Sequence, residues 1–395
     1  MIPKYYIKYA LLVFLNLILS VLSYTFPKTK NQILLGSKDC VHFLGNPKYF
    51  FLYLCSNNTG FTCFWITKNK KLYAKLLQKK LPVLYLYSFK GFFSILRSNF
   101  LVFDHRVSNI SYSIVLPGKF NKIKTYHGTP LKRIEKGSRK SLNSVQKILE
   151  SFNYNSNENS SYKIILATCE ESKKIFINAF NNKRVEILGY PRNDVFFNER
   201  LIFEDYKKSL DLEKYQKIIL YCPTFRDHPT TKTVFSLEFL ENLNKYLRDM
   251  NYVFLIKRHI HYTDIIPTHD FSNILDVSDK IDDVQDLLVS TDILITDYSS
   301  VFFDFILLNK PIIFYCYDFD EYLKNSRDLY YDYFNELPGP FAKNENELLP
   351  ILKSIDHLFN AKEYLEKYNK FVKRFNYFQD GNSSQRLCDY FTNNM

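Results

Sequence analysis

The stretch Asp292-Ile-Leu-Ile-Thr296-Asp297-Tyr298-Ser299-Ser300 decides the fold that this sequence predicts. The apolar residues before Thr296 have the length of a buried parallel strand, and the apolar segment that follows, up to Leu308, is typical of a helix. Ser299 or Ser300 is a suitable N-cap, and the free N–H groups of a first helical turn attract anions. Because open α/β sheets bind phosphorylated ligands at the carboxyl ends of strands, we expect a phosphate site here, with an ordinary capped helix as the alternative.

Length and composition predict two domains and an anionic partner. The 395 residues exceed the usual size of a single core. Only 10 glycines accompany 31 tyrosines and 36 phenylalanines, so aromatic packing is expected and a glycine-rich nucleotide fingerprint is absent. A net charge of +12 suits nucleic acid, an acidic membrane surface or a phosphate-rich substrate, but no basic tract is long enough to favour nucleic acid. The seven scattered cysteines indicate reduced, buried thiols rather than disulfides or a zinc site.

Residues 1–30 are predicted to form a membrane-associated segment. The apolar run from Tyr9 to Phe26 lies between lysines and reaches the lower length limit of a spanning helix. A secretory signal peptide and a buried core helix are the alternatives, although Tyr24-Thr-Phe-Pro27 is a weak cleavage site. We favour an anchor or an interfacial helix.

The remaining chain alternates strand-like and helix-like segments, which predicts two doubly wound parallel-sheet domains facing a cleft. The N-terminal domain is expected at 31–200 and the C-terminal domain at 201–395, with the charged segment from Asn198 to Lys217 as the linker. The apolar runs expected as strands are Ile33–Leu35, Tyr49–Leu54, Phe61–Trp65, Val83–Tyr87, Phe100–Phe103, Lys122–Tyr126, Lys163–Thr168, Val185–Leu188, Lys217–Cys222, Tyr252–Ile256, Ile274–Leu275, Asp292–Thr296 and Pro311–Tyr315. Helices are expected at Glu170–Phe180, Leu237–Met250 and Asp283–Ser290.

His127 is the first candidate catalytic residue. It follows the strand that ends at Tyr126, and after it Gly128 can take positive φ, Thr129 can cap, and Pro130 suits a first helical position. His127 is therefore expected at the carboxyl end of a strand, in a cleft. The alternative is a structural histidine bonded to a backbone carbonyl.

Five other histidines have no partner at ligand or triad spacing, and we interpret them as structural or surface residues: His42, His105, His228, His269 and His357. Asp318-Phe-Asp320 is similar to the Asp-x-Asp motif of metal-dependent glycosyltransferases. We interpret it instead as a turn after a strand, and we expect no metal and no cofactor.

Several motifs occur in an order that resembles one known family. They are His127-Gly-Thr-Pro130, Gly189-Tyr-Pro-Arg192-Asn-Asp194, Tyr221-Cys-Pro-Thr224-Phe-Arg226, Ile256-Lys-Arg-His259, Thr296-Asp-Tyr-Ser-Ser300, Phe303-Asp-Phe305, Lys310-Pro311, Arg327 and Pro338-Gly-Pro340. Together they resemble the CDP-glycerol:glycerophosphate glycerophosphotransferases of teichoic-acid and capsule synthesis, over roughly Lys122 to Phe341. The resemblance implies a GT-B-like architecture and peripheral attachment to the cytoplasmic face of the cell membrane.

The resemblance also implies the reaction and the roles of the site residues. Glycerol phosphate passes from CDP-glycerol to a hydroxyl of an anionic, lipid-linked polymer acceptor, and CMP leaves. His127 acts as general base. His259, Lys257, Arg258 and Arg327 hold the pyrophosphate, Thr296, Ser299 and Ser300 donate hydrogen bonds to it, Gly128 and Thr129 line the substrate site, and Asp297 organises its loop. Ile260 and His261 stand where the family often has proline, so His261 is an alternative to His259.

Three alternatives to this function remain. A CDP-ribitol-dependent ribitolphosphotransferase and a GT-B sugar-nucleotide glycosyltransferase have the same fold and differ in the donor. A non-enzymatic, membrane-associated binding protein is the third. CDP-glycerol, the polymer acceptor and the membrane surface are the expected partners, and nucleic acid is not.

Overall fold

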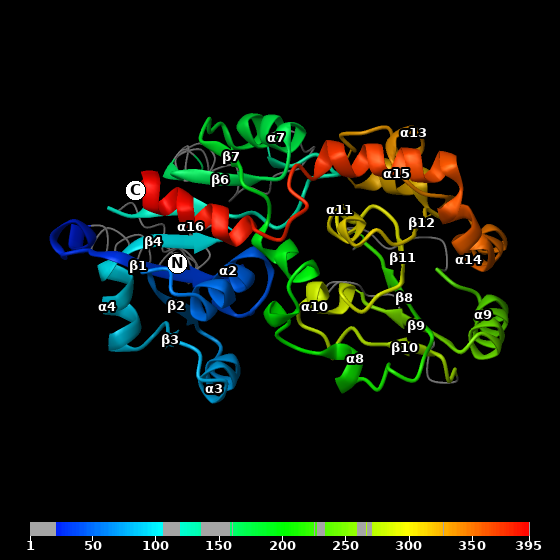
Figure 1. Cartoon of the computed structure of the whole chain (residues 1–395), viewed down its shortest axis with the longest axis horizontal. Coiled ribbons are helices and arrows are strands. Elements are labelled where there is room, and N and C mark those ends of the chain that lie inside the picture. Colours follow the sequence, from blue (N-terminus) through cyan, green and yellow to red (C-terminus); the bar gives the residue numbers. More distant parts are fainter. Residues whose placement is uncertain are drawn as a thin grey trace, which may run out of the picture. The chain divides into compact units, whose positions relative to one another are not determined.

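Strands in the described part of the chain form two separate parallel sheets, each in its own unit (Figure 1). The computed structural model describes residues 21–105, 119–135, 159, 161–224, 226, 234–258, 266, 271–326 and 328–394. The first unit holds the described residues within 1–127, 141–197 and 380–395, and the second holds those within 128–140 and 198–379. The prediction of an α/β protein with two parallel-sheet domains is confirmed.

The first sheet has the strand order β3-β2-β1-β4-β5-β6-β7. Its strands are β1 (Thr29–Gly36), β2 (Thr62–Thr67), β3 (Val83–Tyr85), β4 (Ser98–Phe103), β5 (Asn121–Lys124), β6 (Ile164–Ala167) and β7 (Val185–Ile187). The accompanying helices are α2 (Gly45–Ser56), α3 (Lys70–Gln78), α4 (Phe89–Arg97), α7 (Glu170–Phe180), the 3-10 helix η4 (Pro191–Phe196) and α16 (Ser383–Asn394). Strand order reverses between β1 and β4, which makes this pair the topological switch point.

The second sheet has the order β10-β9-β8-β11-β12-β13 and switches direction between β8 and β11. Its strands are β8 (Lys217–Cys222), β9 (Tyr252–Ile256), β10 (Ile274–Asp276), β11 (Ile293–Thr296), β12 (Ile312–Tyr315) and β13 (Phe341–Ala342). The helices are α8 (Tyr206–Ser209), α9 (Leu237–Asp249), α10 (Val284–Leu288), α11 (Phe302–Phe305), α12 (Phe319–Asn325), α13 (Tyr333–Glu336), α14 (Glu345–Asn360) and α15 (Lys362–Phe375), with short 3-10 helices η5 (Glu199–Leu201) and η6 (Ile306–Leu308).

Aromatic rings fill the core of the second unit, as the composition predicts. Phe235 stacks on Tyr315 with 5.5 Å between ring centroids, and it also contacts Tyr221 at 5.1 Å. Offset and edge-on ring contacts of this kind add to the free energy gained by burying the rings. All seven cysteines are free, and six of them are buried; Cys55 is exposed.

The run Tyr49–Leu54 is not a strand, and this prediction is wrong. It lies in helix α2, whose residues Tyr49, Phe50 and Phe51 are fully buried. A segment that is apolar on every side has neither the two-residue nor the 3.6-residue period, so sequence pattern alone does not separate a buried strand from a buried helix.

The predicted domain limits differ from the two units in two places. Helix α16 belongs to the first unit, where Phe391 stacks on Phe100 at 4.8 Å and contacts Phe50 at 5.8 Å. Figure 1 shows this helix, in red, lying along α2. The predicted linker is also part of a folded unit, because Tyr206 and Phe203 bond to the segment around α10: Tyr206 Oη accepts from the N–H of Asp282, and Asp286 accepts from the N–H of Phe203.

Most of the predicted membrane-associated segment lies outside the described residues, and residues 21–25 of it are helical. Among the helices that the structure describes, none combines the length and the apolarity required to cross a membrane.

Candidate functional site

His127 follows strand β5 in the first unit and is held through its backbone. The residue before it, Tyr126, has φ 55°, a left-handed conformation that is costly for a bulky side chain. Buried Asn46 stabilises this turn, since its Nδ2 donates to the carbonyls of Thr125 and Tyr126 at 3.1 and 2.9 Å. Arg192 donates to the His127 carbonyl at 2.8 Å. His127 therefore lies beyond the carboxyl end of a strand, with an exposed side chain.

The residues after His127 do not begin a helix as far as Ile134, which corrects the expectation from Thr129 and Pro130. Gly128 does take positive φ, at 146°. Beyond it, Lys132 forms an antiparallel bridge with Leu329, and the N–H of Arg133 donates to the carbonyl of Asp328. These backbone groups find partners in a distant segment rather than in a local helical turn. Gly128 and Thr129 are both buried.

His105 has two neighbours in the fold that its position in the sequence did not indicate. Its Nδ1 lies 2.9 Å from Oδ1 of Asp104, and its ring stacks on His127 with 4.9 Å between centroids and 16° between planes. Register explains the contact, because Phe103 at the end of β4 pairs with Lys124 at the end of β5. The sequence offered Asp104-His105 directly after an apolar run as a signal, but not the neighbouring strand.

The surroundings of His127 favour its neutral form. Desolvation by the surrounding protein atoms and the charge of His105 lower the pKa of His127 well below its usual value, and Arg192 and Lys124 act in the same direction. Asp104 acts in the opposite direction. A neutral imidazole at physiological pH is the form that accepts a proton.

The motif from Gly189 to Asp194 stabilises the backbone around His127. Arg192 bonds the His127 carbonyl, as described, and its own N–H donates to Asn46. Buried Asp194 accepts from the N–H groups of Ser383 and Ser384, at 2.9 and 2.7 Å, and so caps helix α16. Gly189 has φ 80° and lies so close to Ser383 that no side chain fits there. This motif is thus structural in the first unit.

In the second unit, the turn from Thr296 to Ser300 lies at the topological switch point. Thr296 pairs with Cys222 on β8 and with Phe314 on β12, so the loops after the three strands emerge side by side. The Thr296 hydroxyl donates to the carbonyl of Cys222 at 2.7 Å and is fully buried. That hydroxyl therefore holds two strands together and does not face a ligand, which differs from its predicted role.

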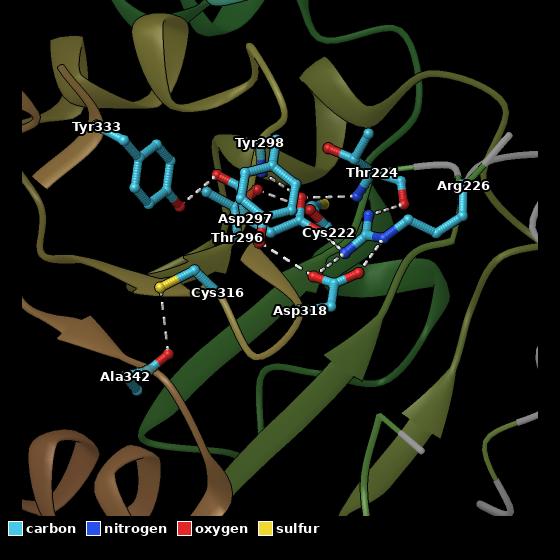
Figure 2. A network of polar contacts seen from close by, with 10 residues as sticks. All are labelled: Cys222, Thr224, Arg226, Thr296, Asp297, Tyr298, Cys316, Asp318, Tyr333 and Ala342. Atoms are coloured by element: carbon cyan, nitrogen blue, oxygen red, sulfur yellow. Dashed lines mark hydrogen bonds and ion pairs between the residues drawn. The ribbon is translucent and has the colours of Figure 1, made fainter. Parts of the chain in front are cut away.

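Asp297 organises the loop, as predicted. Its Oδ1 accepts from the N–H groups of Thr224 and Tyr298, at 2.8 and 2.6 Å, and its carbonyl accepts from the hydroxyl of Tyr333 at 3.0 Å (Figure 2). Its Oδ2 lies 2.8 Å from the guanidinium of Arg226. Thr224 and Arg226 follow strand β8, Tyr333 lies in α13, and Tyr298 belongs to the same loop as Asp297.

Arg226 and Asp318 complete a buried polar network that the sequence analysis did not identify as a site. Arg226 bonds both carboxylate oxygens of Asp318, at 2.7 and 3.0 Å, and the hydroxyl of Tyr298 donates to Asp318 at 3.0 Å (Figure 2). Two carboxylates around one guanidinium form a structural ion cluster. Asp318 is thus engaged with Arg226. The segment Asp318-Phe-Asp320 is the start of helix α12 rather than a turn, since Asp318 is the N-cap and Phe319 and Asp320 are helical. Among the described residues, no group of three or more His, Cys, Asp or Glu is arranged to hold a metal ion.

The helix after the turn is shorter than predicted. Helix α11 spans only Phe302–Phe305 before η6 continues to Leu308, and its N-cap is Val301, without a side-chain cap. Ser299 Oγ accepts from the N–H of Val301 at a long 3.4 Å. Neither Ser299 nor Ser300 is the predicted helix cap, and both are partly exposed. Their hydroxyls are therefore not committed to helix formation.

Lys257 and Arg258 follow strand β9, next to β8 in the sheet. Lys257 Nζ donates to the carbonyls of Arg258 and Ser278, both at 3.4 Å, and burial lowers the pKa of Lys257. Arg258 pairs with Asp276 at 2.6 Å. Both cations lie at the same edge of the sheet as the Thr296–Ser300 turn. His259 and Arg327, the other two predicted phosphate ligands, lie outside the described residues, as does His261.

Comparison with solved structures defines the class of protein. Structures of the wall teichoic acid polymerase TagF match 92% of this chain and 89% of theirs, with a TM-score of 0.77 and 28–29% identity. A histidine-to-asparagine variant of TagF with CDPG has a TM-score of 0.78. A UDP-GlcNAc 2-epimerase from Neisseria meningitidis shares the fold alone, at 14% identity and a TM-score of 0.52. The chain is therefore an α/β protein of the GT-B type.

The family follows from the sequence matches. The pattern of the CDP-glycerol:poly(glycerophosphate) glycerophosphotransferases matches residues 18–393, and the chain belongs to this family. A teichoic acid glycerol-phosphate transferase from Staphylococcus aureus is 34% identical, over 91% of this chain and 92% of that protein. A teichoic acid poly(glycerol phosphate) polymerase from Bacillus subtilis is 28% identical over 92% of this chain, which spans about half (49%) of that protein. The resemblance stated from the motifs is confirmed.

Proposed function

We propose that this protein transfers glycerol phosphate from CDP-glycerol to a hydroxyl of a membrane-linked teichoic-acid acceptor. The acceptor oxygen attacks the β-phosphorus, an O–P bond forms, and the P–O bond to CMP breaks, so that CMP leaves with the bonding electron pair. His127 takes the proton of the attacking hydroxyl. The observation that carries this proposal is the exposed position of His127 beyond the end of a parallel strand, in a member of this transferase family.

The second unit binds the donor in this proposal. The carboxyl ends of β8, β9 and β11 carry Lys257, Arg258 and the partly exposed hydroxyls of Ser299 and Ser300. Cations and hydroxyl donors at a topological switch point suit a pyrophosphate, whose charge grows on the leaving CMP during transfer. His259 and Arg327 belong to the same donor site in this proposal. Asp297 and Arg226 hold the loops in place and do not contact the phosphates.

Glycerol is the favoured polyol. Two glycerol-phosphate relatives, from Staphylococcus aureus and Bacillus spizizenii, are 34% and 30% identical and align over 91% and 92% of this chain. The ribitol-phosphate relatives align over only 58% of it, at 35% and 32% identity. A CDP-ribitol-dependent transfer is therefore the second candidate, since it requires the same pyrophosphate site.

We also propose that the protein works at the cytoplasmic face of the cell membrane, attached peripherally. Helix α4 supports this, because Phe89, Phe92 and Phe93 are exposed on it, at 87%, 36% and 43%, beside exposed Lys90 and Arg97. Exposed aromatic rings among cations are typical of helices that lie in a membrane interface. The Phe93 ring contacts Phe26, at the end of the predicted membrane-associated segment, with 5.7 Å between centroids.

The decisive assay uses the purified full chain with a lipid-linked glycerol-phosphate acceptor. CDP-glycerol, CDP-ribitol and UDP-sugars are supplied separately, and acceptor-dependent release of CMP or UDP is measured. We expect CMP release with CDP-glycerol and its loss in His127→Ala. Preference for CDP-ribitol selects the second candidate, and UDP release from a sugar nucleotide contradicts both.

Binding to the membrane is tested with vesicles that contain anionic lipid. We expect Phe89→Ser with Phe93→Ser to weaken cosedimentation, whereas Tyr377→Ser, which changes a 62% exposed ring in the second unit, leaves it unchanged. Equal effects of the two changes contradict a role for α4.

A further inference from the structure

We propose that Asp104 and His105 form a positioning pair for His127, in which the carboxylate of Asp104 fixes the ring of His105 and that ring packs against His127. The inference rests on the proposed role of His127 as general base, and it adds the two residues that prepare it for that role. Asp104 supplies a fixed carboxylate, and His105 links that carboxylate to the ring of His127. The pair thus sets the charge that the ring of His127 faces.

The carboxylate of Asp104 is fixed from three directions. It is fully buried, its Oδ2 accepts from the hydroxyl of Ser37 at 2.7 Å, and its Oδ1 accepts from the N–H of Lys38 at 3.3 Å. His105 Nδ1 supplies the third contact at 2.9 Å. Although burial alone raises it, the pKa of Asp104 is lowered, because the charge and hydrogen bond of His105 and the bond from Ser37 outweigh burial. Asp104 is therefore a carboxylate that fixes the tautomer and orientation of the His105 ring.

Topology places this pair where a ligand is expected. Gly36 at the end of β1 pairs with Phe103 at the end of β4, so Ser37 and Asp104 emerge side by side at the switch point of the first sheet. Crevices outside the carboxyl ends of strands at such a point bind ligands in open α/β sheets. His105, whose side chain is 29% exposed, continues from this point towards His127 on the next strand.

The stacked rings make the two histidines a coupled system. Nδ1 of His105 lies 2.9 Å from the carboxylate of Asp104, and the ring of His105 stacks on that of His127. The ring of a protonated His127 lies 4.9 Å from the ring of His105, whose charge disfavours that proton. Lys124 at the end of β5 and Arg192 on η4 also oppose that proton, and Asp104 favours it. The ring of Tyr126 packs 4.1 Å from that of His127. Like charges at this separation disfavour each other, so the charge of His105 favours the neutral form of His127.

The test measures the titration of His127 directly in the full chain. Isotope-labelled histidine gives one NMR signal for each ring, and the signal of His127 is identified by its loss in His127→Gln. We expect His105→Gln to raise the His127 pKa by about half a pH unit or more, because a positive neighbour is removed. We expect His105→Lys, which keeps a positive charge without the ring, to leave it low. His357→Gln, at an exposed position on α14, serves as the matched control and leaves it unchanged.

These outcomes separate the inference from the proposed function. The inference is overturned if neither His105 variant moves the His127 pKa, or if both move it equally, since a merely structural role predicts one of those results. The pH dependence of kcat/KM then tests the base. If the acid limb of kcat/KM follows the His127 pKa in each variant, both the positioning pair and the role of His127 as general base are supported. If the His127 pKa changes and the acid limb does not, the pair exists but His127 is not the general base. His105 is partly exposed, so its variants are expected to fold, and circular dichroism verifies this.

Discussion

The guanidinium of Arg226 lies 2.8 Å from the Oδ2 carboxylate oxygen of Asp297, and both side chains are almost completely removed from solvent. The two residues follow β8 and β11, the strands on either side of the switch point of the second sheet. Asp318, after β12, completes the ion cluster. The guanidinium of Arg226 therefore connects the loops after β8, β11 and β12, which surround the proposed donor site (Figure 2).

Removing this guanidinium is expected to destabilise the second unit strongly. Arg226→Met leaves two buried carboxylates without a cation, and breaking a buried pair in this way costs about 3–5 kcal/mol. The measurement is urea unfolding of the second unit, followed by a probe placed in it. Lys214→Met, which breaks the exposed pair with Asp211, is the matched control and should cause no measurable change. Similar effects of the two variants would show that the cluster is not a structural element.

Transfer activity is expected to persist to unusually low pH. A general base works without its proton, and the pKa of His127 is lowered first by desolvation and then by His105, so the acid limb of kcat/KM should fall well below the usual histidine value of about 6.5. The rate of CMP release is measured across pH to obtain this acid limb. We expect kcat/KM to fall about tenfold per pH unit only at pH values below the pKa of His127. His127→Ala should abolish transfer while CDP-glycerol still binds. An acid limb at or above the usual value contradicts this assignment.

The hydroxyls of Ser299 and Ser300 are expected to matter for donor binding and not for stability. Because Ser299 makes only a 3.4 Å bond to the Val301 N–H and α11 has no side-chain cap, changing both serines to alanine should cost less than about 1 kcal/mol of unfolding free energy. Loss of charge-assisted bonds should raise the dissociation constant of CDP-glycerol at least ~10-fold.

Titration with CMP completes that experiment. CMP lacks the β-phosphate, so its affinity should fall less than that of CDP-glycerol in the double variant. Ser354→Ala, on the exposed side of α14, should change neither affinity. An equal or greater loss for CMP would refute a pyrophosphate site at this turn.

Asp194 is expected to control the attachment of helix α16 to the first unit. Asp194→Ala leaves the N–H groups of Ser383 and Ser384 without their acceptor, which should cost about 1–3 kcal/mol. Limited proteolysis at Arg386 measures this, since a detached helix is cut faster. Asp389→Ala, which removes an exposed side chain of the same helix, should not accelerate cleavage.

The same carboxyl should make stability depend on pH. Burial raises the pKa of Asp194 from 3.8 to about 6, and the bonds from Ser384 and Ser383 limit the rise. A carboxyl with a raised pKa binds its proton more tightly in the folded chain, so its contribution to stability is present below 3.8 and is lost as the pH rises through about 6. Unfolding measured across this range should show that decline in the natural chain and not in Asp194→Ala.

Many elements followed from the sequence because local pattern determines them. The predicted limits of β8, β9 and α7 agree with the structure, since each is an apolar run or an amphipathic segment bounded by polar residues. The order of the motifs was sufficient to identify the family. The role of Asp297 was also predictable, because a carboxylate repels phosphate.

Other predictions from the sequence were wrong because the features concerned have no local sequence signal. Helix α2 resembled a strand because its apolar residues are buried on all sides, and α11 is a single turn although its sequence could continue. Thr296 looked like a phosphate donor, but its hydroxyl is used by the Cys222 carbonyl of the neighbouring strand.

The sequence by itself determined most of the strands, some of the helices, the family and the position of His127 at a strand end. Only the tertiary structure decided that His105 stacks on His127, that Ser37 holds Asp104, and that Arg226 joins Asp297 to Asp318. The physical reason is that these contacts depend on strand order in the sheets. Residues far apart in the chain meet because β1 pairs with β4, β4 with β5, and β8 with β11, and a pattern of apolar residues defines each strand without defining its neighbours.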